Sequence, residues 1–328
     1  MTQSIRIGIL GYGNLGRGVE TALKHNPDMS LVGVFTRRAP EQLKTVDEQT
    51  PVYSIAQLKD FQDKIDVLIL CGGSKDDLPK QTPEYAAFFN TVDSFDTHAK
   101  IPEFYASVDA AAAPAKKTAL ISVGWDPGLF SLNRLYAEAV LPDGETYTFW
   151  GKGLSQGHSD AVRRVEGVKA GVQYTLPSEK AMAEVRTGSR PTLATRDKHT
   201  RECYVVLEDG ADAAQVEEAI KTMPNYFDEY ETAVHFIDEE TLQRDHTKMP
   251  HGGFVIRSGN TRPEHNQVVE YGLQLGDNPG FTSSVLVAYA RAAYRMNQQG
   301  QYGAKTVFDV APGLLSIKSP EQLRKEML

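Results

Sequence analysis

A glycine-rich segment close to the start of the chain most strongly constrains the fold. Residues 5–10 (IRIGIL) form an apolar run rich in β-branched side chains, which predicts a buried strand. Residues 11–16 then match G-x-G-x-x-G, residues 14–25 have the pattern of a helix, and residues 31–35 predict a second strand. Strand, glycine loop, helix and strand within about thirty residues are typical of a βαβ unit that binds a dinucleotide.

The three glycines have separate physical roles in such a unit. Gly11 lets the chain turn sharply off the strand, Gly13 lets the backbone approach a pyrophosphate, and Gly16 lets the helix pack closely. The helix N-terminus adds free N–H groups that bind phosphate. The residues of this loop that we expect to contact the cofactor are Gly11, Tyr12, Gly13, Asn14, Leu15 and Gly16.

The end of the second strand indicates which dinucleotide binds. An NAD enzyme usually has an acid here, which accepts hydrogen bonds from the ribose 2′-hydroxyl and repels a 2′-phosphate. This chain instead has Thr36, Arg37 and Arg38, and its next acid is Glu41. A hydroxyl and two guanidinium groups can bind a phosphate dianion, although most such arginine pairs are solvated basic turns. Because the pair lies within the glycine fingerprint, we predict an NADP(H) site.

Composition limits the other possibilities. A length of 328 residues suggests two domains. The net charge of −8 argues against a nucleic-acid partner or an anionic membrane surface. No apolar run approaches the length of a membrane span, and the strand at residues 5–10 begins too early for a signal peptide. Cys71 and Cys203 are far apart and suggest reduced thiols. We therefore expect a cytoplasmic protein.

Alternating strands and helices continue to residue 123. Continuous apolar runs such as IDVLILC suit parallel strands buried on both faces. The pattern predicts an N-terminal, Rossmann-type doubly wound parallel sheet of α/β class in a domain of residues 1–123. The further strands expected there are residues 65–71, 90–93 and 118–123, and the helices are residues 57–64, 84–89 and 101–113.

The pattern changes at GWDPG, residues 124–128. Strands without regular helical crossovers follow, which predicts a second α+β domain at residues 124–278. A long amphipathic helix at residues 282–299 belongs to the segment 279–328, which we expect to return to the first domain. The expected strands of the second domain are residues 146–150, 202–207, 234–237, 253–258 and 267–275, with a helix at residues 211–221.

Two acids follow neighbouring strands of the predicted sheet. Because ligands bind beyond the carboxyl ends of such strands, Asp96 and Asp126 are expected near the nicotinamide. Each also has an ordinary structural alternative, since Asp96 could cap the next helix and Asp126 could be a turn residue. The strand-end residues expected to line the cofactor site are Cys71, Gly72, Gly73, Ser74, Ser94, Phe95, Asp96, Val123, Gly124, Trp125, Asp126 and Pro127.

Other motifs suggest different chemistry. GLSQG matches the G-x-S-x-G of serine hydrolases, with Ser155 as the nucleophile, but it lies outside the parallel sheet. His246 and His251 fit no zinc spacing and no C-x-x-C is present, so we expect no metal. Arg201 could bind a substrate carboxylate and His251 could contact a ligand, whereas a surface arginine and a structural histidine are the plain alternatives.

Several runs together resemble one enzyme family, the meso-diaminopimelate D-dehydrogenases, over about residues 4–315. They are GYGNLGRGVE, FTRRAP, TVDSFDTH, GWDPGLFSLNR, TFWGKGLSQGHSDAVRR, VQYTLPSE, TMPNYF and KMPHGG. The resemblance implies NADP-dependent, reversible oxidative deamination at the D-centre of meso-2,6-diaminopimelate, which releases ammonium. The product, L-2-amino-6-oxoheptanedioate, cyclises to tetrahydrodipicolinate, a precursor for lysine and cell wall. A homodimer is also implied. A non-catalytic NADPH-binding regulator is the alternative from another class.

The resemblance also assigns residues to roles. It implies that Asp96 and Asp126 act near the reacting D-amino group. Hydride leaves Cα only when the amine is neutral, so a nearby carboxylate must accept a proton or stabilise the emerging iminium. The base is left open between Asp96, Asp126 and bound water. The residues implied to line the reacting end are Trp125, Trp150 and Gln156, and those implied to hold the distal L-amino-acid end are Thr175, Arg201, His251 and Asn278.

Overall fold

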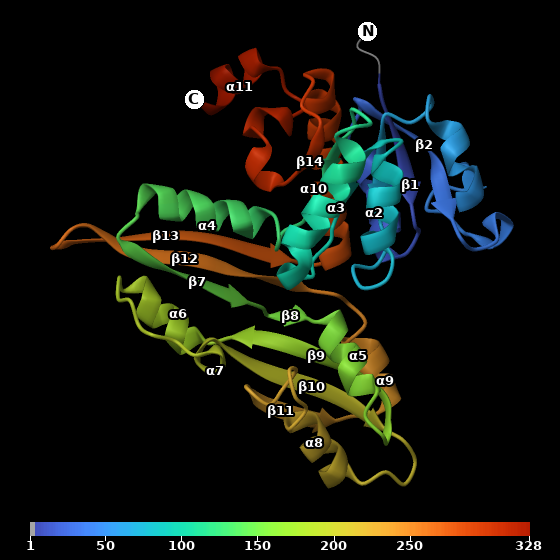
Figure 1. Ribbon diagram of the computed structural model, residues 1–328. Coiled ribbons are helices and arrows are strands. Elements are labelled where there is room, and N and C mark those ends of the chain that lie inside the picture. Colours follow the sequence, from blue (N-terminus) through green and yellow to red (C-terminus); the bar gives the residue numbers. More distant parts are fainter. Residues whose placement is uncertain (1–3) are drawn as a thin grey trace. The chain divides into compact units, whose positions relative to one another are not determined.

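The structure is a computed structural model that describes residues 4–328, and the chain forms two compact units (Figure 1). The first contains the chain up to residue 132 together with residues 279–328, and the second contains residues 133–278. The division falls inside helix α4 (Leu129–Val140), later than the boundary expected after residue 123.

The first unit is built on a seven-stranded sheet in which every pairing is parallel. The spatial order is β14-β6-β5-β4-β1-β2-β3. This is the 3-2-1-4-5-6 order of a dinucleotide-binding sheet, extended at β6 by a strand from the C-terminal segment. The predicted α/β fold class is confirmed. The strands are β1 (Ile5–Leu10), β2 (Met29–Thr36), β3 (Val52–Ser54), β4 (Val67–Leu70), β5 (Asn90–Asp93), β6 (Thr118–Leu120) and β14 (Gly303–Lys305).

The two faces of this sheet carry separate apolar cores. In β4, Val67 and Ile69 pack with side chains of α1 and α10, whereas Leu68 and Leu70 pack with side chains of α2 and α3. Alternation along the strand thus buries both faces, as a parallel sheet requires. The helices of this unit are α1 (Asn14–Leu23), α2 (Leu78–Ala86), α3 (Ile101–Ala112), α10 (Asn278–Gln298) and α11 (Pro320–Met327).

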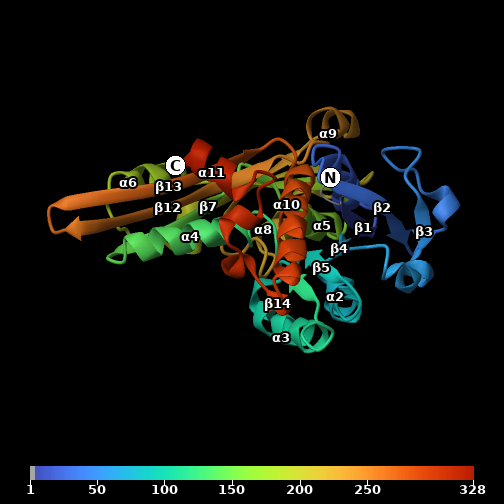
Figure 2. The same cartoon turned by 90° about the horizontal axis from the view of Figure 1, so that it is seen from above.

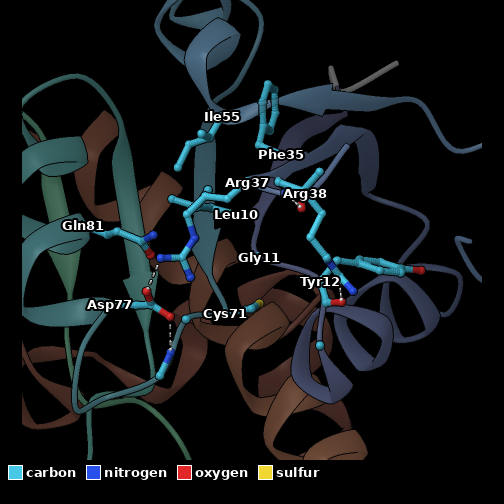
Figure 3. A pocket seen from close by; sticks show the side chains of 14 residues that line it. Leu10, Gly11, Tyr12, Phe35, Arg37, Arg38, Ile55, Cys71, Asp77 and Gln81 are labelled. Carbon is cyan, nitrogen blue, oxygen red and sulfur yellow. Dashed lines mark hydrogen bonds and ion pairs between the residues drawn. The ribbon is translucent and has the colours of Figure 1, made fainter. Parts of the chain in front are cut away.

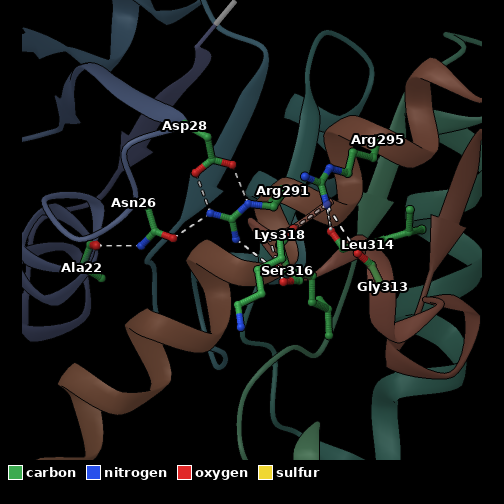
Figure 4. Close-up of polar contacts among 10 residues, drawn as sticks. Ala22, Asn26, Asp28, Arg291, Arg295, Gly313, Leu314, Ser316 and Lys318 are labelled. Atoms are coloured by element: carbon green, nitrogen blue, oxygen red, sulfur yellow. Dashed lines mark hydrogen bonds and ion pairs between the residues drawn. The ribbon is translucent and has the colours of Figure 1, made fainter. Parts of the chain in front are cut away.

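A buried guanidinium attaches α10 to the N-terminal half of the sheet (Figure 4). Arg291 is 1% exposed and donates to both carboxylate oxygens of Asp28 at 2.6 and 2.7 Å. It also donates to Asn26 Oδ1 at 2.7 Å and to the carbonyl of Leu315 at 2.9 Å. Because its partners are an acid and two neutral acceptors, this buried charge is compensated within the chain.

The second unit contains two mixed or antiparallel sheets. One has the order β11-β10-β9-β8 and the other β13-β12-β7, and only β10 and β11 pair in parallel. The strands are β7 (Gly144–Trp150), β8 (Gly153–Leu154), β9 (Val168–Pro177), β10 (His199–Leu207), β11 (Glu231–Phe236), β12 (His251–Arg262) and β13 (His265–Leu275). The helices are α5 (Gln156–Arg163), α6 (Glu179–Arg186), α7 (Thr195–Lys198), α8 (Ala213–Lys221) and α9 (Glu239–Asp245).

The three-stranded sheet is covered differently on its two faces. Tyr147, Phe149 and Ile256 pack with α6 in one apolar core. Thr148 points to the opposite face, where its hydroxyl accepts a hydrogen bond from Arg134 of α4 at 3.2 Å. Figures 1 and 2 both show α4 running beside the long β12–β13 hairpin. Side chains of α4 that point away from the sheet remain exposed.

Several predicted elements have different limits in the structure. The helix expected at residues 84–89 begins earlier, at Leu78. Its two prolines are compatible with this start, because Pro79 lies in the first turn, where no N–H is needed, and Pro83 removes only one backbone hydrogen bond. The strand expected at residues 118–123 ends at Leu120. The segment expected as a helix at residues 57–64 is a 3-10 helix, Ile55–Phe61. Strand β9 was not predicted, although it is central to its sheet.

Candidate functional site

A cavity of about 270 Å³ lies at the carboxyl ends of β1, β2 and β4 in the first unit (Figure 3). An open parallel sheet binds its ligands at this edge. Asn14, Leu15 and Gly16 belong to the adjoining first turn of α1. The predicted cofactor residues that line the cavity are Gly11, Tyr12, Gly13, Thr36, Arg37, Arg38, Cys71, Gly72 and Gly73.

The glycines of this loop meet different constraints. Gly11 has φ +91°, which favours glycine, and a Cβ on Gly16 would lie 2.3 Å from the carbonyl oxygen of Gly11. At Gly13 a Cβ would meet no protein atom within 4 Å. Packing within the protein therefore does not require glycine at position 13, whereas close approach of a pyrophosphate does.

Both arginines of the fingerprint line the cavity, and each has a partner (Figure 3). Arg38 donates to the carbonyl of Tyr12 at 2.6 Å, and its backbone N–H donates to Thr36 Oγ1 at 3.1 Å. Arg37 forms an ion pair with Asp77 at 2.8 Å, but its side chain is 66% exposed. Asp77 in turn accepts from the N–H of Gly73 at 3.2 Å. Asp77, an acid beside the expected phosphate site, was not predicted from the sequence.

The strand-end acids occupy different environments. Asp96 is exposed, and its backbone N–H donates to Ser74 Oγ at 3.2 Å, so the ends of β4 and β5 meet there. Asp126 is half-buried in the turn between Gly124 and Gly128. A Cβ on Gly128 would lie 1.9 Å from the carbonyl oxygen of Gly124, so the second glycine of GWDPG is required by this turn. Beside Asp126, the Trp125 indole is 8% exposed.

A row of residues crosses the four-stranded sheet of the second unit. Gly153 of β8 pairs with Thr175 of β9, and Thr175 pairs with Arg201 of β10. The imidazole of His251 packs against Gly153, where a Cβ would lie 2.5 Å from the ring. The structure therefore aligns His251, Thr175 and Arg201, three residues that were predicted to bind one end of the substrate.

Arg201 is buried without an acidic partner. Its side chain is 7% exposed, Nη1 donates to Thr175 Oγ1, and its guanidinium carbon lies 4.0 Å from the centre of the Tyr230 ring. Among residues 4–328, no carboxylate pairs with it, and its Nε has no hydrogen-bond partner. Burial lowers the pKa of Arg201, and the Tyr230 hydroxyl opposes this. Tyr230 was not predicted, since nothing in its sequence context distinguishes it.

The other predicted residues of this unit lie near two residues that were not predicted. Trp150 stacks on His199, with ring centres 5.2 Å apart, and its backbone N–H donates to His199 Nε2 at 2.8 Å. Gln156 donates to Met249 Sδ at 3.3 Å, and the backbone N–H of Asn278 donates to the Met249 carbonyl at 2.9 Å. Burial, reinforced by the nearby Arg201, lowers the pKa of His199 to about 3, so this histidine is a neutral acceptor.

Ser155 and His158 contact each other, as a nucleophile and its base would. Ser155 Oγ lies 2.8 Å from His158 Nδ1, and the same hydroxyl caps the N-terminus of α5. Burial and the charge of Arg201 lower the pKa of His158 to about 4, which makes it a weak base. No carboxylate within the described residues orients this histidine. The pair therefore lacks the third member of a hydrolase triad.

No group of three or more His, Cys, Asp or Glu side chains in residues 4–328 is arranged to hold a metal ion. None of the helices in that range is long and apolar enough to cross a membrane.

The parallel sheet, its glycine loop and the basic cavity define a dinucleotide-binding protein of the oxidoreductase type. The family of the diaminopimelic acid dehydrogenase C-terminal domain matches residues 124–277. The meso-diaminopimelate D-dehydrogenase of Ureibacillus thermosphaericus is 64% identical over 324 residues, 99% of both chains. The chain belongs to the meso-diaminopimelate D-dehydrogenase family, as its sequence motifs predicted.

Two solved structures are similar over the whole chain. A DAP dehydrogenase of C. glutamicum in complex with DAP has a TM-score of 0.91 and 50% identity, and the match covers 100% of both chains. An engineered D-amino acid dehydrogenase bound to NADP+ has a TM-score of 0.86 and 49% identity, with 99% of this chain and 100% of that one covered.

Proposed function

We propose that this protein catalyses the NADP-dependent, reversible oxidative deamination of the D-centre of meso-2,6-diaminopimelate. The products are L-2-amino-6-oxoheptanedioate, which cyclises to tetrahydrodipicolinate, and ammonium. Family membership over the full chain supports the reaction. One observation on this chain's own residues supports a substrate that bears a carboxylate. Arg201 is a buried guanidinium that lacks a carboxylate partner within the described residues. A substrate carboxylate would supply the missing anionic partner of this guanidinium.

The residues of the first unit fit NADP(H). Backbone at Gly11–Gly16 would hold the pyrophosphate, and Thr36, Arg37 and Arg38 would hold the 2′-phosphate. NADP+, when bound, supplies the hydride acceptor. For Arg37 to bind phosphate it must share or leave its contact with Asp77, and its exposure permits either.

We assign Asp96 and Asp126 to the reacting amino group. Asp96 is exposed and Asp126 is half-buried, and either carboxylate could accept a proton from the ammonium group or stabilise the iminium. Trp125, Trp150 and Gln156 line that end. Thr175, Arg201, His251 and Asn278 hold the distal amino-acid end and thereby fix which of the two similar centres reacts.

We also propose a homodimer in the cytoplasm. Helix α4 exposes Leu135, Tyr136 and Val140, the last at 71% of its surface, and β13 exposes Val268 and Val269 at the edge of its sheet. An unpaired strand edge and exposed large apolar side chains favour a contact with a second copy. Sedimentation of the purified protein as a monomer at micromolar concentration would contradict the dimer.

One assay tests the reaction and the assignment of ends. With NADP+, the meso isomer should give steady NADPH formation and ammonium, whereas the L,L isomer, which has no D-centre, should be a poor substrate. A non-catalytic NADPH-binding regulator would give neither product. Comparable rates with both isomers would contradict the assignment of ends. As a control, the protein should not hydrolyse acyl esters, and any such activity that Ser155→Ala abolished would revive the hydrolase alternative.

A further inference from the structure

Asp93, the last residue of β5, connects three segments of the first unit. It is fully buried, and its Oδ1 accepts hydrogen bonds from the backbone N–H groups of Phe95 and Ser122, each at 3.0 Å. Its Oδ2 accepts from Thr82 Oγ1 of α2 at 3.0 Å. The backbone carbonyl of Asp93 also accepts from the N–H of Val123 at 2.9 Å. One residue therefore bonds to the chain that follows β5 and to the chain that follows β6.

A carboxylate is energetically unfavourable at this buried position. All the groups that donate to it are neutral, and burial raises the pKa of Asp93 to about 6. A buried carboxylate without a cation lowers the stability of a fold. An ionised oxygen nevertheless binds backbone N–H groups more strongly than a neutral one does. The residue is thus better suited to fixing two strand ends than to stabilising the sheet.

The backbone at Ser122 supports this interpretation. Ser122 has φ +55°, in the left-handed region that residues other than glycine seldom adopt and that costs about 1 kcal/mol or more. Its N–H bond to Asp93 and the neighbouring bond from Val123 hold this conformation. On the other strand end, Phe95 is 1% exposed and stacks on Phe104 with ring centres 4.1 Å apart. The two backbone N–H groups that donate to Asp93 therefore belong to segments whose conformations are also held by other contacts.

The two strand ends bear the acids assigned to the reacting centre. Asp96 directly follows Phe95, and Asp126 follows Ser122 within the same turn segment. We propose that Asp93 is a positioning residue, which sets the two strand ends so that Asp96 and Asp126 act on one amino group. This inference rests on the proposed function, which assigns the roles of Asp96 and Asp126.

Three substitutions separate positioning from other roles. Asp93→Ala removes both acceptor oxygens, and Asp93→Leu does so while retaining the branched arrangement of the side-chain heavy atoms, with two larger methyl groups in place of the oxygens. Asp93→Asn keeps Oδ1 for the two backbone amides, and its new NH₂ can donate to Thr82, whose hydroxyl is able to reverse. Thr82→Val is the matched control, since it removes only the Oδ2 contact. For each variant we would measure kcat and the KM for meso-diaminopimelate, the NADPH dissociation constant and the melting temperature. Rates would be normalised to the concentration of NADPH-binding sites.

We expect Asp93→Ala and Asp93→Leu to lower kcat about 10–100-fold, the effect of a small misplacement of reacting groups. NADPH affinity should change less than about twofold, because neither Asp93 nor the segments that it bonds after β5 and β6 line the basic cavity at the ends of β1, β2 and β4. Asp93→Asn should restore kcat to within about threefold, and Thr82→Val should stay in that range.

Unchanged kcat in the folded Ala or Leu variant would overturn the proposal. So would an equal loss of NADPH binding, or failure of both variants to fold, since either result would indicate a general structural role. A wild-type protein that does not oxidise meso-diaminopimelate would instead refute the proposed function. Wild-type activity together with an active Asp93→Leu variant would refute the positioning role alone.

Discussion

Arg201→Met should lower activity and raise stability at the same time. The structure supplies the reason for the opposite signs. Arg201 is 7% exposed, and within the described residues its charge has the Thr175 hydroxyl and Tyr230 as partners but no carboxylate. Such a guanidinium is costly in the free protein and becomes compensated when a carboxylate binds. Methionine fills a similar volume and brings no charge.

The magnitudes follow from the contacts that are lost. One charged hydrogen bond to a substrate carboxylate contributes about 1.5–3 kcal/mol, so kcat/KM for meso-diaminopimelate should fall about 10–150-fold. Replacing a poorly compensated buried charge by an apolar side chain is neutral or stabilises by up to about 4 kcal/mol. Leaving Thr175 without its donor removes about 1 kcal/mol of this. We therefore expect a net gain of about 1 kcal/mol or more, equivalent to a few degrees in melting temperature.

The assay compares thermal unfolding and steady-state kinetics of wild type, Arg201→Met and Arg190→Met. Arg190 is a suitable control because it is an exposed arginine of the same unit, paired with Asp143 at 2.6 Å. Its replacement should change neither quantity appreciably. Added meso-diaminopimelate should raise the melting temperature of the wild type and have little effect on Arg201→Met. A variant less stable than wild type, or one with kcat/KM within threefold of it, would refute the reasoning.

Three further outcomes are expected. Replacing Arg37 and Arg38 together by glutamine should raise the KM for NADP at least about tenfold and leave NAD use nearly unchanged; equal losses with both cofactors would contradict the phosphate site. The folded-state pKa of Asp93 is raised from 3.8 to about 6, so the cost of its charge is absent below pH 4 and complete above pH 6. Between pH 7 and pH 4, the wild type should therefore gain about 2 kcal/mol of unfolding free energy relative to Asp93→Asn, and a constant difference would refute this. Arg291→Met should lower the unfolding free energy by about 3 kcal/mol at neutral pH. Arg291 lowers the pKa of Asp28, so this loss should diminish as the pH falls through that lowered pKa, and an undiminished loss at low pH would count against the ion pair.

The sequence was most informative where function depends on consecutive residues. The glycine loop and the arginines after β2 form one continuous segment, so their position in a βαβ unit followed from spacing alone. The family resemblance added Thr175 to Arg201 and His251 and gave the three a common role, and the register of β8, β9 and β10 with the packing of His251 on Gly153 aligns them. No local pattern could have revealed that alignment, because it depends on the pairing of strands that are far apart in sequence.

Other residues were missed because their significance depends on a partner distant in sequence. In the sequence, nothing distinguishes Asp77 within its polar segment. Only the fold shows that Arg37 lies beside it. Asp93 ends a short strand in a run with three polar residues, and only the fold shows that its oxygens hold the chain after β6. Tyr230 follows no apolar periodicity, since it packs on the Arg201 guanidinium instead of in an apolar core.

A comparison of two buried arginines shows how a ligand site differs from a structural one in this chain. Arg291 has an acid, an amide and a carbonyl as acceptors, and its pairing joins distant parts of the first unit (Figure 4). Arg201 is nearly as buried, yet its Nε has no partner within the described residues, and its pKa is lowered by burial. A protein gains nothing in stability from a buried charge that it does not compensate. Such a charge is useful when a ligand provides the missing anion, and for this reason Arg201 is the residue whose loss should separate activity from stability.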